Sequence, residues 1–116
     1  MTETIVLTIP AGARGAGVVA LVLGGLGSRL DLSIDRVDEL TLAADVLGAA
    51  ALHERLELAM TVEDDRLLVR MGPLENGAVS EQGRRRVLEP LVDRVGVVAC
   101  EGREYAELEL ARGERG

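Results

Sequence analysis

Residues 18–52 read VVALVLGGLGSRLDLSIDRVDELTLAADVLGAAAL, and this stretch decides the fold class because it predicts two helices in succession. Apolar side chains recur in it at intervals of three and four residues, the period of a helix with one buried face. Asp31-Leu32-Ser33 interrupts the pattern, and Asp35 is expected to cap the second helix ahead of an acidic first turn. The predicted helices span residues 13–30 and 35–52.

Three glycines, Gly24, Gly25 and Gly27, lie inside the first predicted helix. Each costs roughly 1 kcal/mol relative to alanine in a helix interior. They could admit a second helix at close range or let this helix lie flat on a sheet, and the second explanation is favoured. Tertiary packing is therefore expected to override the cost.

Strands are predicted on both sides of the helix pair. Upstream, β-branched and aliphatic residues run to Pro10, which ends the first strand. Downstream, apolar residues alternate with polar ones as in half-buried strands, and two short turns return the chain as hairpins. The five predicted strands span residues 3–9, 55–63, 66–71, 95–100 and 105–110.

Residues 72–85 contain glycine, proline, asparagine and serine, which predicts a long loop. A short third helix is expected over residues 87–95, with Pro90 in its first turn. The resulting β-α-α-β-β-α-β-β order predicts an α+β two-layer sandwich, with helices on one face of a mixed, mainly antiparallel sheet. A single domain is expected over residues 1–111, followed by a disordered tail at 112–116.

The composition excludes several classes of function. All 13 basic residues are arginine, so the chain has no lysine for a Walker motif, a Schiff base or a general base. The 20 acidic residues bring the net charge to −7, which opposes nucleic-acid binding, and the core must be aliphatic because Phe and Trp are absent. No pattern of a signal peptide or membrane span is present, so a cytoplasmic protein with no membrane contact is expected.

Residues 18–52 resemble the first two helices of bacterial anti-sigma-factor serine kinases. These are small members of the GHKL, or Bergerat-fold, ATPases, whose fold is histidine-kinase-like. The resemblance extends over nearly the whole chain, and Leu91-Val92-Asp93-Arg94-Val95 at the end of the third helix is a further family-like mark. It implies a Bergerat-type fold.

The resemblance also implies where Mg·ATP would bind. In the family an Asn on the second helix ligates the metal, and a Glu four residues before it acts as base. In an ungapped register these positions fall on Ala50 and Val46, and neither side chain can perform that chemistry. The only Asn is Asn76, in the predicted loop, and Asp45 lies one residue from the base position on a different side of the helix.

Two further family motifs are changed in this chain. The Asp that binds the adenine amine is replaced by Met71, or by Arg70 if Gly72 is aligned with the first glycine of the motif. A later Gly-Thr pair is reduced to Gly102-Arg103. The resemblance therefore implies a fold without nucleotide chemistry, with no catalytic residue, cofactor or metal.

A regulator of this kind would act by binding a protein, either a sigma factor or an anti-anti-sigma protein, and the resemblance also makes a homodimer plausible. The candidate contacts are the first helix and the loop at 72–86, with Arg84, Arg85 and Arg86. The competing interpretation of these arginines is a solvated helix start. The alternative function is an ATP-dependent protein serine kinase with displaced site residues, in which Asp45 is the base; a scaffold subunit is a third possibility.

The remaining motifs have structural explanations that are favoured over functional ones. The glycine-rich residues 12–17 follow a strand and open a helix, as a phosphate cradle would, but their spacing favours a flexible helix start or close helix packing. His53 is expected to interact with a helix C-terminus and Cys100 to be a small buried hydrophobe. Asp38-Glu39 and Asp64-Asp65 are expected in a helix turn and a hairpin turn, without a metal.

Overall fold

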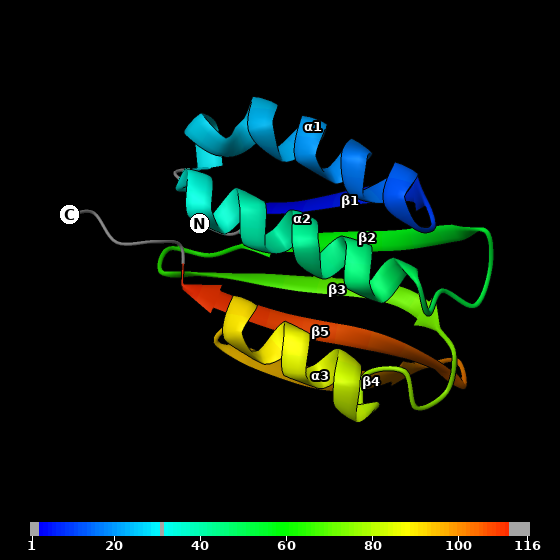
Figure 1. Cartoon of the computed structure of the whole chain (residues 1–116). Helices are drawn as coiled ribbons and strands as arrows, with labels where there is room; N and C mark the ends of the chain where they lie inside the picture. The colour runs from blue at the N-terminus through cyan, green and yellow to red at the C-terminus, as the bar shows by residue number, and fades with distance from the viewer. Residues whose placement is uncertain (1–2, 31, 112–116) are drawn as a thin grey trace.

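The computed structural model describes residues 3–30 and 32–111, so the predicted tail at 112–116 lies outside the described residues. Figure 1 shows a sheet with a layer of helices over it. The elements, in chain order, are β1 (Glu3–Pro10), α1 (Ala13–Leu30), α2 (Ile34–Gly48), β2 (Arg55–Val62), β3 (Arg66–Leu74), α3 (Gln82–Leu88), a single 3-10 turn η1 (Glu89–Leu91), β4 (Arg94–Cys100) and β5 (Arg103–Ala111).

The sheet has the strand order β1-β2-β3-β5-β4, and each neighbouring pair is antiparallel. The α+β class is confirmed, whereas the expected mixed sheet is not. Between β1 and β2 the chain runs through α1 and α2 in opposite directions (Figure 1). Strand β2 therefore starts at the end of the sheet where β1 ends and must run antiparallel to β1. One helix joins β3 to β4, which makes those two strands parallel, but β5 lies between them.

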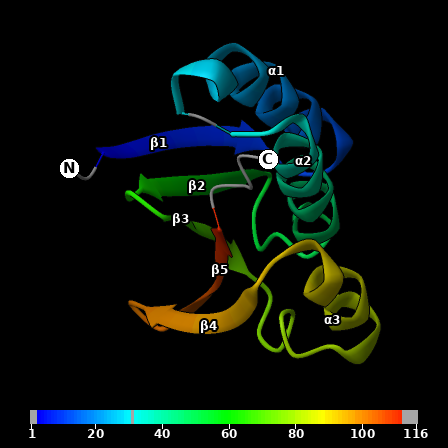
Figure 2. The same cartoon turned by 90° about the vertical axis from the view of Figure 1, so that its left-hand side faces the viewer.

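All three helices lie on one face of the sheet (Figure 2). The core between the layers is aliphatic, and no polar or charged residue is buried in the described part of the chain. Alternation places the apolar residues of β2 and β5 inward, as the sequence predicts. Their fully buried members are Leu56, Leu58, Met60, Ala106, Leu108 and Leu110.

The start and end of α2 differ from the prediction. Ser33, rather than Asp35, is the N-cap, because its Oγ accepts a hydrogen bond from the backbone N–H of Arg36 at 3.2 Å. The helix ends at Gly48 instead of residue 52. A Cβ on Gly48 would lie 2.8 Å from the nitrogen of Gly12, so the end of α2 packs directly on the turn before α1.

The third helix begins five residues earlier than predicted, at Gln82, and ends at Leu88. The carboxylate of Glu81 caps it by accepting hydrogen bonds from the backbone N–H groups of Gly83 and Arg84. Pro90 lies in the first turn of the 3-10 segment that follows, where its missing N–H is not needed. The sequence pattern hid the start of this helix because its first five residues, Gln82 to Arg86, are glutamine, glycine and three arginines and show no apolar period.

Helix α1 contacts β1 and α2 and extends past the edge of β1 (Figures 1 and 2). Its glycines have unequal surroundings. A Cβ on Gly15 would lie 1.8 Å from the carbonyl oxygen of Pro10, whereas one on Gly17, Gly24 or Gly25 would meet nothing within 4 Å. The prediction that Gly24 and Gly25 let the helix lie flat on the sheet is therefore wrong, and the surroundings of Gly27 are outside those described.

Candidate functional site

The three positions that the family resemblance assigns to nucleotide chemistry lie in or against the core. Ala50 is 1% exposed and Met71 is fully buried, while Val46 is half-buried and packs against the same cluster. They come from the end of α2 and from the middle of β3. None of their side chains offers an oxygen or a proton-accepting group.

Strand β3 extends to Leu74, three residues beyond the predicted strand. Residues 75–81, called the closed segment below, follow it. The carboxylate of Glu104 holds this segment, because its two oxygens accept hydrogen bonds from the backbone N–H groups of Gly77 and Val79 at 2.8 and 3.0 Å. Glu104 comes from the neighbouring strand β5. Residues 75–81 are thus fixed to the sheet by one side chain that sequence reasoning did not single out.

Two apolar side chains of the same segment are buried in the core. Val79 is fully buried and Ala78 is 5% exposed, and both belong to the core cluster. The backbone N–H of Glu75 donates to the carbonyl of Ala50 at 2.9 Å, which closes the end of α2 against β3. Ala50, one of the three positions named above, is therefore tied to the start of this segment by a backbone hydrogen bond.

The three consecutive arginines are not equivalent. Arg84 donates through Nη1 to the carbonyl of Ala78 at 2.9 Å, so it supports the closed segment. Arg85 pairs with Glu89 at 3.0 Å and donates to the carbonyl of Val95 at 3.2 Å. Arg86 is exposed and has no hydrogen-bonding or ionic partner within the described part of the chain. Of these three arginines, only Arg86 has a guanidinium without a hydrogen-bonding or ionic partner among the described residues.

Glu81 gives this region a pH dependence. The Glu81 carboxylate accepts hydrogen bonds from the backbone N–H groups of Gly83 and Arg84, and these bonds hold the pKa of Glu81 below its usual value. A lowered folded-state pKa means that this carboxylate stabilises the fold at neutral pH and that the contribution is lost as the pH falls through the folded pKa. We expect Glu81→Gln to lower the Tm at neutral pH and the difference from the native protein to shrink below pH 4.5, measured by thermal unfolding across pH. A Tm difference that persists unchanged into the acid range would contradict this assignment.

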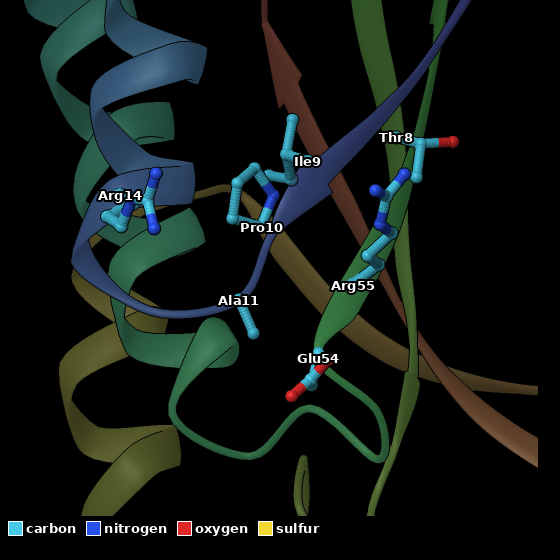
Figure 3. Close-up of a pocket in the computed structure, with 7 residues that line it drawn as sticks. All are labelled: Thr8, Ile9, Pro10, Ala11, Arg14, Glu54 and Arg55. Atoms are coloured by element: carbon cyan, nitrogen blue, oxygen red, sulfur yellow. The ribbon is translucent and has the colours of Figure 1, made fainter.

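A hollow of about 720 Å³ lies at the carboxyl end of β1 (Figure 3). Arg14 lines it from the first turn of α1, and Arg55 lines it from the start of β2. Figure 3 shows the two guanidinium groups on opposite sides of Pro10, while the carboxylate of Glu54 points away from Arg55. The remaining lining residues are Thr8, Ile9 and Ala11.

The geometry of this hollow suits acidic groups on a partner surface better than one small anion. Neither Arg14 nor Arg55 has a carboxylate partner among residues 3–30 and 32–111, but the two do not converge on one point. The glycine-rich start of α1 is also not a cradle, because Gly15 is in direct contact with Pro10. Of the two favoured interpretations of residues 12–17, close packing agrees with this contact and a flexible helix start does not.

Two expectations about single side chains are wrong. Cys100 is exposed, because it lies at the end of an outer strand rather than in the core. His53 is exposed and lies five residues past the end of α2, with Nε2 3.1 Å from Nη1 of Arg103. Asp45, the base of the alternative kinase hypothesis, is exposed on α2 and lines a shallow hollow against α1 with Asp38.

Comparisons with known proteins identify no relative. The chain matches no protein-family model, and a search of curated proteins finds no match either. Among the described residues, no helix has both the length and the apolar content of a membrane span. In the same residues, no three His, Cys, Asp or Glu side chains gather as a metal-ligand cluster.

Proposed function

We propose that this chain has a Bergerat-type, histidine-kinase-like fold without a nucleotide site, and that it regulates transcription by binding a protein, as anti-sigma factors do. The observation that carries the proposal is the burial of apolar residues at positions that the resemblance assigns to the nucleotide site, since Ala50 is 1% exposed and Met71 is fully buried. Val79 is buried in the same core cluster, and Glu104 holds residues 75–81 to the sheet. The proposed regulator is cytoplasmic, and its partner is a sigma factor or an anti-anti-sigma protein.

The surface supports binding better than catalysis. Uncommitted cations are distributed over it at Arg14, Arg55 and Arg86, and the exposed side of α1 carries Leu21, which is 77% exposed. Exposed apolar side chains and arginines without an ionic partner are both available to contact another protein. The kinase alternative has no comparable support, because Asp45 shares its hollow with Asp38 alone among acidic residues and belongs to no group of three metal-ligand side chains in the described residues.

Titration calorimetry with ATP and with ADP in excess Mg²⁺ tests the loss of the nucleotide site. We expect no heat of binding and no change in Tm, because no polar side chain reaches the positions of Val46, Ala50 and Met71. A ligand at 100 times its dissociation constant would add about 2.7 kcal/mol of stability, a readily measured shift. Micromolar binding of either nucleotide would contradict this proposal and favour the protein serine kinase alternative. Transfer of labelled γ-phosphate to a partner protein, abolished by Asp45→Asn, would do the same.

Arg86→Ser tests the binding surface. We expect it to weaken the affinity for a sigma-factor partner about tenfold or more, since hydrogen bonds to charged groups contribute roughly 1.5–3 kcal/mol. The Tm should not change, because Arg86 has no partner inside the described chain. Arg70→Ser is the matched control, because Arg70 is an exposed arginine of β3 on the face of the sheet opposite the buried side chains. Equal losses for both variants would point to general electrostatic attraction instead of a contact at α3.

A further inference from the structure

The strand β4 forms one outer edge of the sheet, since it pairs with β5 alone. It reads Arg94-Val95-Gly96-Val97-Val98-Ala99-Cys100 and has no charge, proline or bulge between its ends. Outer strands of soluble proteins are usually protected by such features because their free backbone groups can pair with another chain. In the described part of the chain, no element lies beyond β4 in the plane of the sheet (Figure 2).

The turn between β4 and β5 fixes which backbone groups of β4 point outward. Glu101 and Gly102 both have positive φ, 53° and 77°, and form a two-residue hairpin turn. The residues that flank such a turn, Cys100 and Arg103, exchange backbone hydrogen bonds. Because hydrogen-bonded pairs alternate along an antiparallel ladder, every second residue before Cys100 also bonds to β5. The N–H and C=O groups of the residues between them point away from the sheet. These residues are Val95, Val97 and Ala99.

Two observations agree with this direction. The carbonyl of Val95 accepts its hydrogen bond from Arg85, which can reach it only if it points away from β5. The side chain of Val97 lies on the helix-covered face, since its partner in the register is the buried Ala106, yet it is 49% exposed. An apolar side chain and free backbone groups therefore coincide at the middle of this edge.

The opposite edge of the sheet is different. Helix α1 contacts β1 and extends past it, so an added strand would meet the helix (Figures 1 and 2). This contrast singles out β4 as the accessible edge. Whatever pairs with it must supply an uncharged extended segment with small aliphatic side chains.

We propose that the partner of β4 is β4 of a second copy of this chain, paired antiparallel about a two-fold axis at Val97, so that two five-stranded sheets become one ten-stranded sheet. In this register Val97 lies opposite its own counterpart and Val95 lies opposite Ala99. Every outward N–H of these residues then donates to an outward carbonyl, and aliphatic residues face aliphatic residues. The register places Arg94 opposite Cys100, so no like charges face each other within the paired stretch.

Two further features suit a second copy. Each chain carries a charge of −7, so close approach is least unfavourable along an uncharged strand. Arg85 can stay in place, because a carbonyl oxygen accepts two hydrogen bonds and the guanidinium reaches Val95 from α3. The inference does not rest on the proposed function, since it uses only the edge of the sheet.

Disulfide trapping tests the register. In a Cys100→Ser background, Val97→Cys should give a covalent dimer under mild oxidation, because the paired Cα atoms would be about 5.5 Å apart, within disulfide range. Val6→Cys in the same background is the control, since Val6 is 61% exposed on the other outer strand. No covalent dimer at Val97, or equal trapping at Val6, would overturn the proposal.

Sedimentation equilibrium tests the association without a cross-link. The native chain should dimerise, with affinity that rises with ionic strength as repulsion between the acidic copies is screened. Val97→Arg should weaken dimerisation at least about tenfold by placing two like charges at the axis, with an unchanged Tm at concentrations where both chains are monomers. Leu21→Arg should remain dimeric. A native chain that is monomeric at every concentration, or a dimeric Val97→Arg variant, would contradict the assignment.

Discussion

Gly15→Ala is expected to destabilise the fold by about 3 kcal/mol, at the upper end of overpacking substitutions. The added Cβ would lie 1.8 Å from the carbonyl oxygen of Pro10 and 3.3 Å from Cδ1 of Ile9. Neither neighbour is free to move, because Pro10 closes β1 and Ile9 is buried in the core. Thermal unfolding should show a Tm lowered by roughly 10–20 °C.

The matched control is Gly17→Ala, two residues along the same helix. A Cβ on Gly17 would meet nothing within 4 Å, so only helix propensity changes. Stability should rise by about 0.8–1 kcal/mol. Effects of the same sign at Gly15 and Gly17 would mean that the close contact between α1 and Pro10 is not the cause.

Glu104→Ala is expected to release residues 75–81 and to cost about 2–3 kcal/mol, because two backbone N–H groups lose a charged acceptor. Val79 is fully buried, so its N–H would be left without a partner in the protein interior. Hydrogen exchange should accelerate roughly thirtyfold at Gly77 and Val79. The exchange rates in Glu104→Gln should fall between those of the native protein and those of Glu104→Ala, since the glutamine amide keeps one accepting oxygen for two donors.

Glu107→Ala is the control on the same strand. Glu107 pairs with Arg70 at 3.2 Å, and both side chains are more than two-fifths exposed, so the loss should be below about 1 kcal/mol. Exchange at Gly77 and Val79 should stay unchanged. If Glu104→Ala left these amides as protected as Glu107→Ala does, the segment would be held by the burial of Val79 and not by the carboxylate.

The element order could be predicted from the sequence because periodicity reports burial directly. The alternation in β2 and β5 places one residue in two against the helices, and both strands follow it over their full length. The limits of the elements depend on single hydrogen bonds that periodicity does not describe. Ser33 and Glu81 set two helix starts through their side-chain oxygens, and glutamate at a helix start is not a common cap.

The candidate site could be predicted only in part. The apolar character of Val46, Ala50 and Met71 is visible in the sequence, and so is the arginine triplet. What occupies the space beside them is not visible, because Glu104 reaches Val79 from a strand 25 residues away in the chain. An isolated glutamate in an alternating strand has the pattern of an ordinary outward-facing residue.

The place of β5 between β3 and β4 bears on how the protein is made. A ribosome releases β3 and β4 before the strand that joins them, so the two have no common neighbour until residue 111 has emerged. The β1-β2-β3 part of the sheet can therefore pair before β4 has a neighbour, and β5 must insert between β3 and β4 once it has been synthesised. The five-stranded sheet is accordingly completed only after translation of β5.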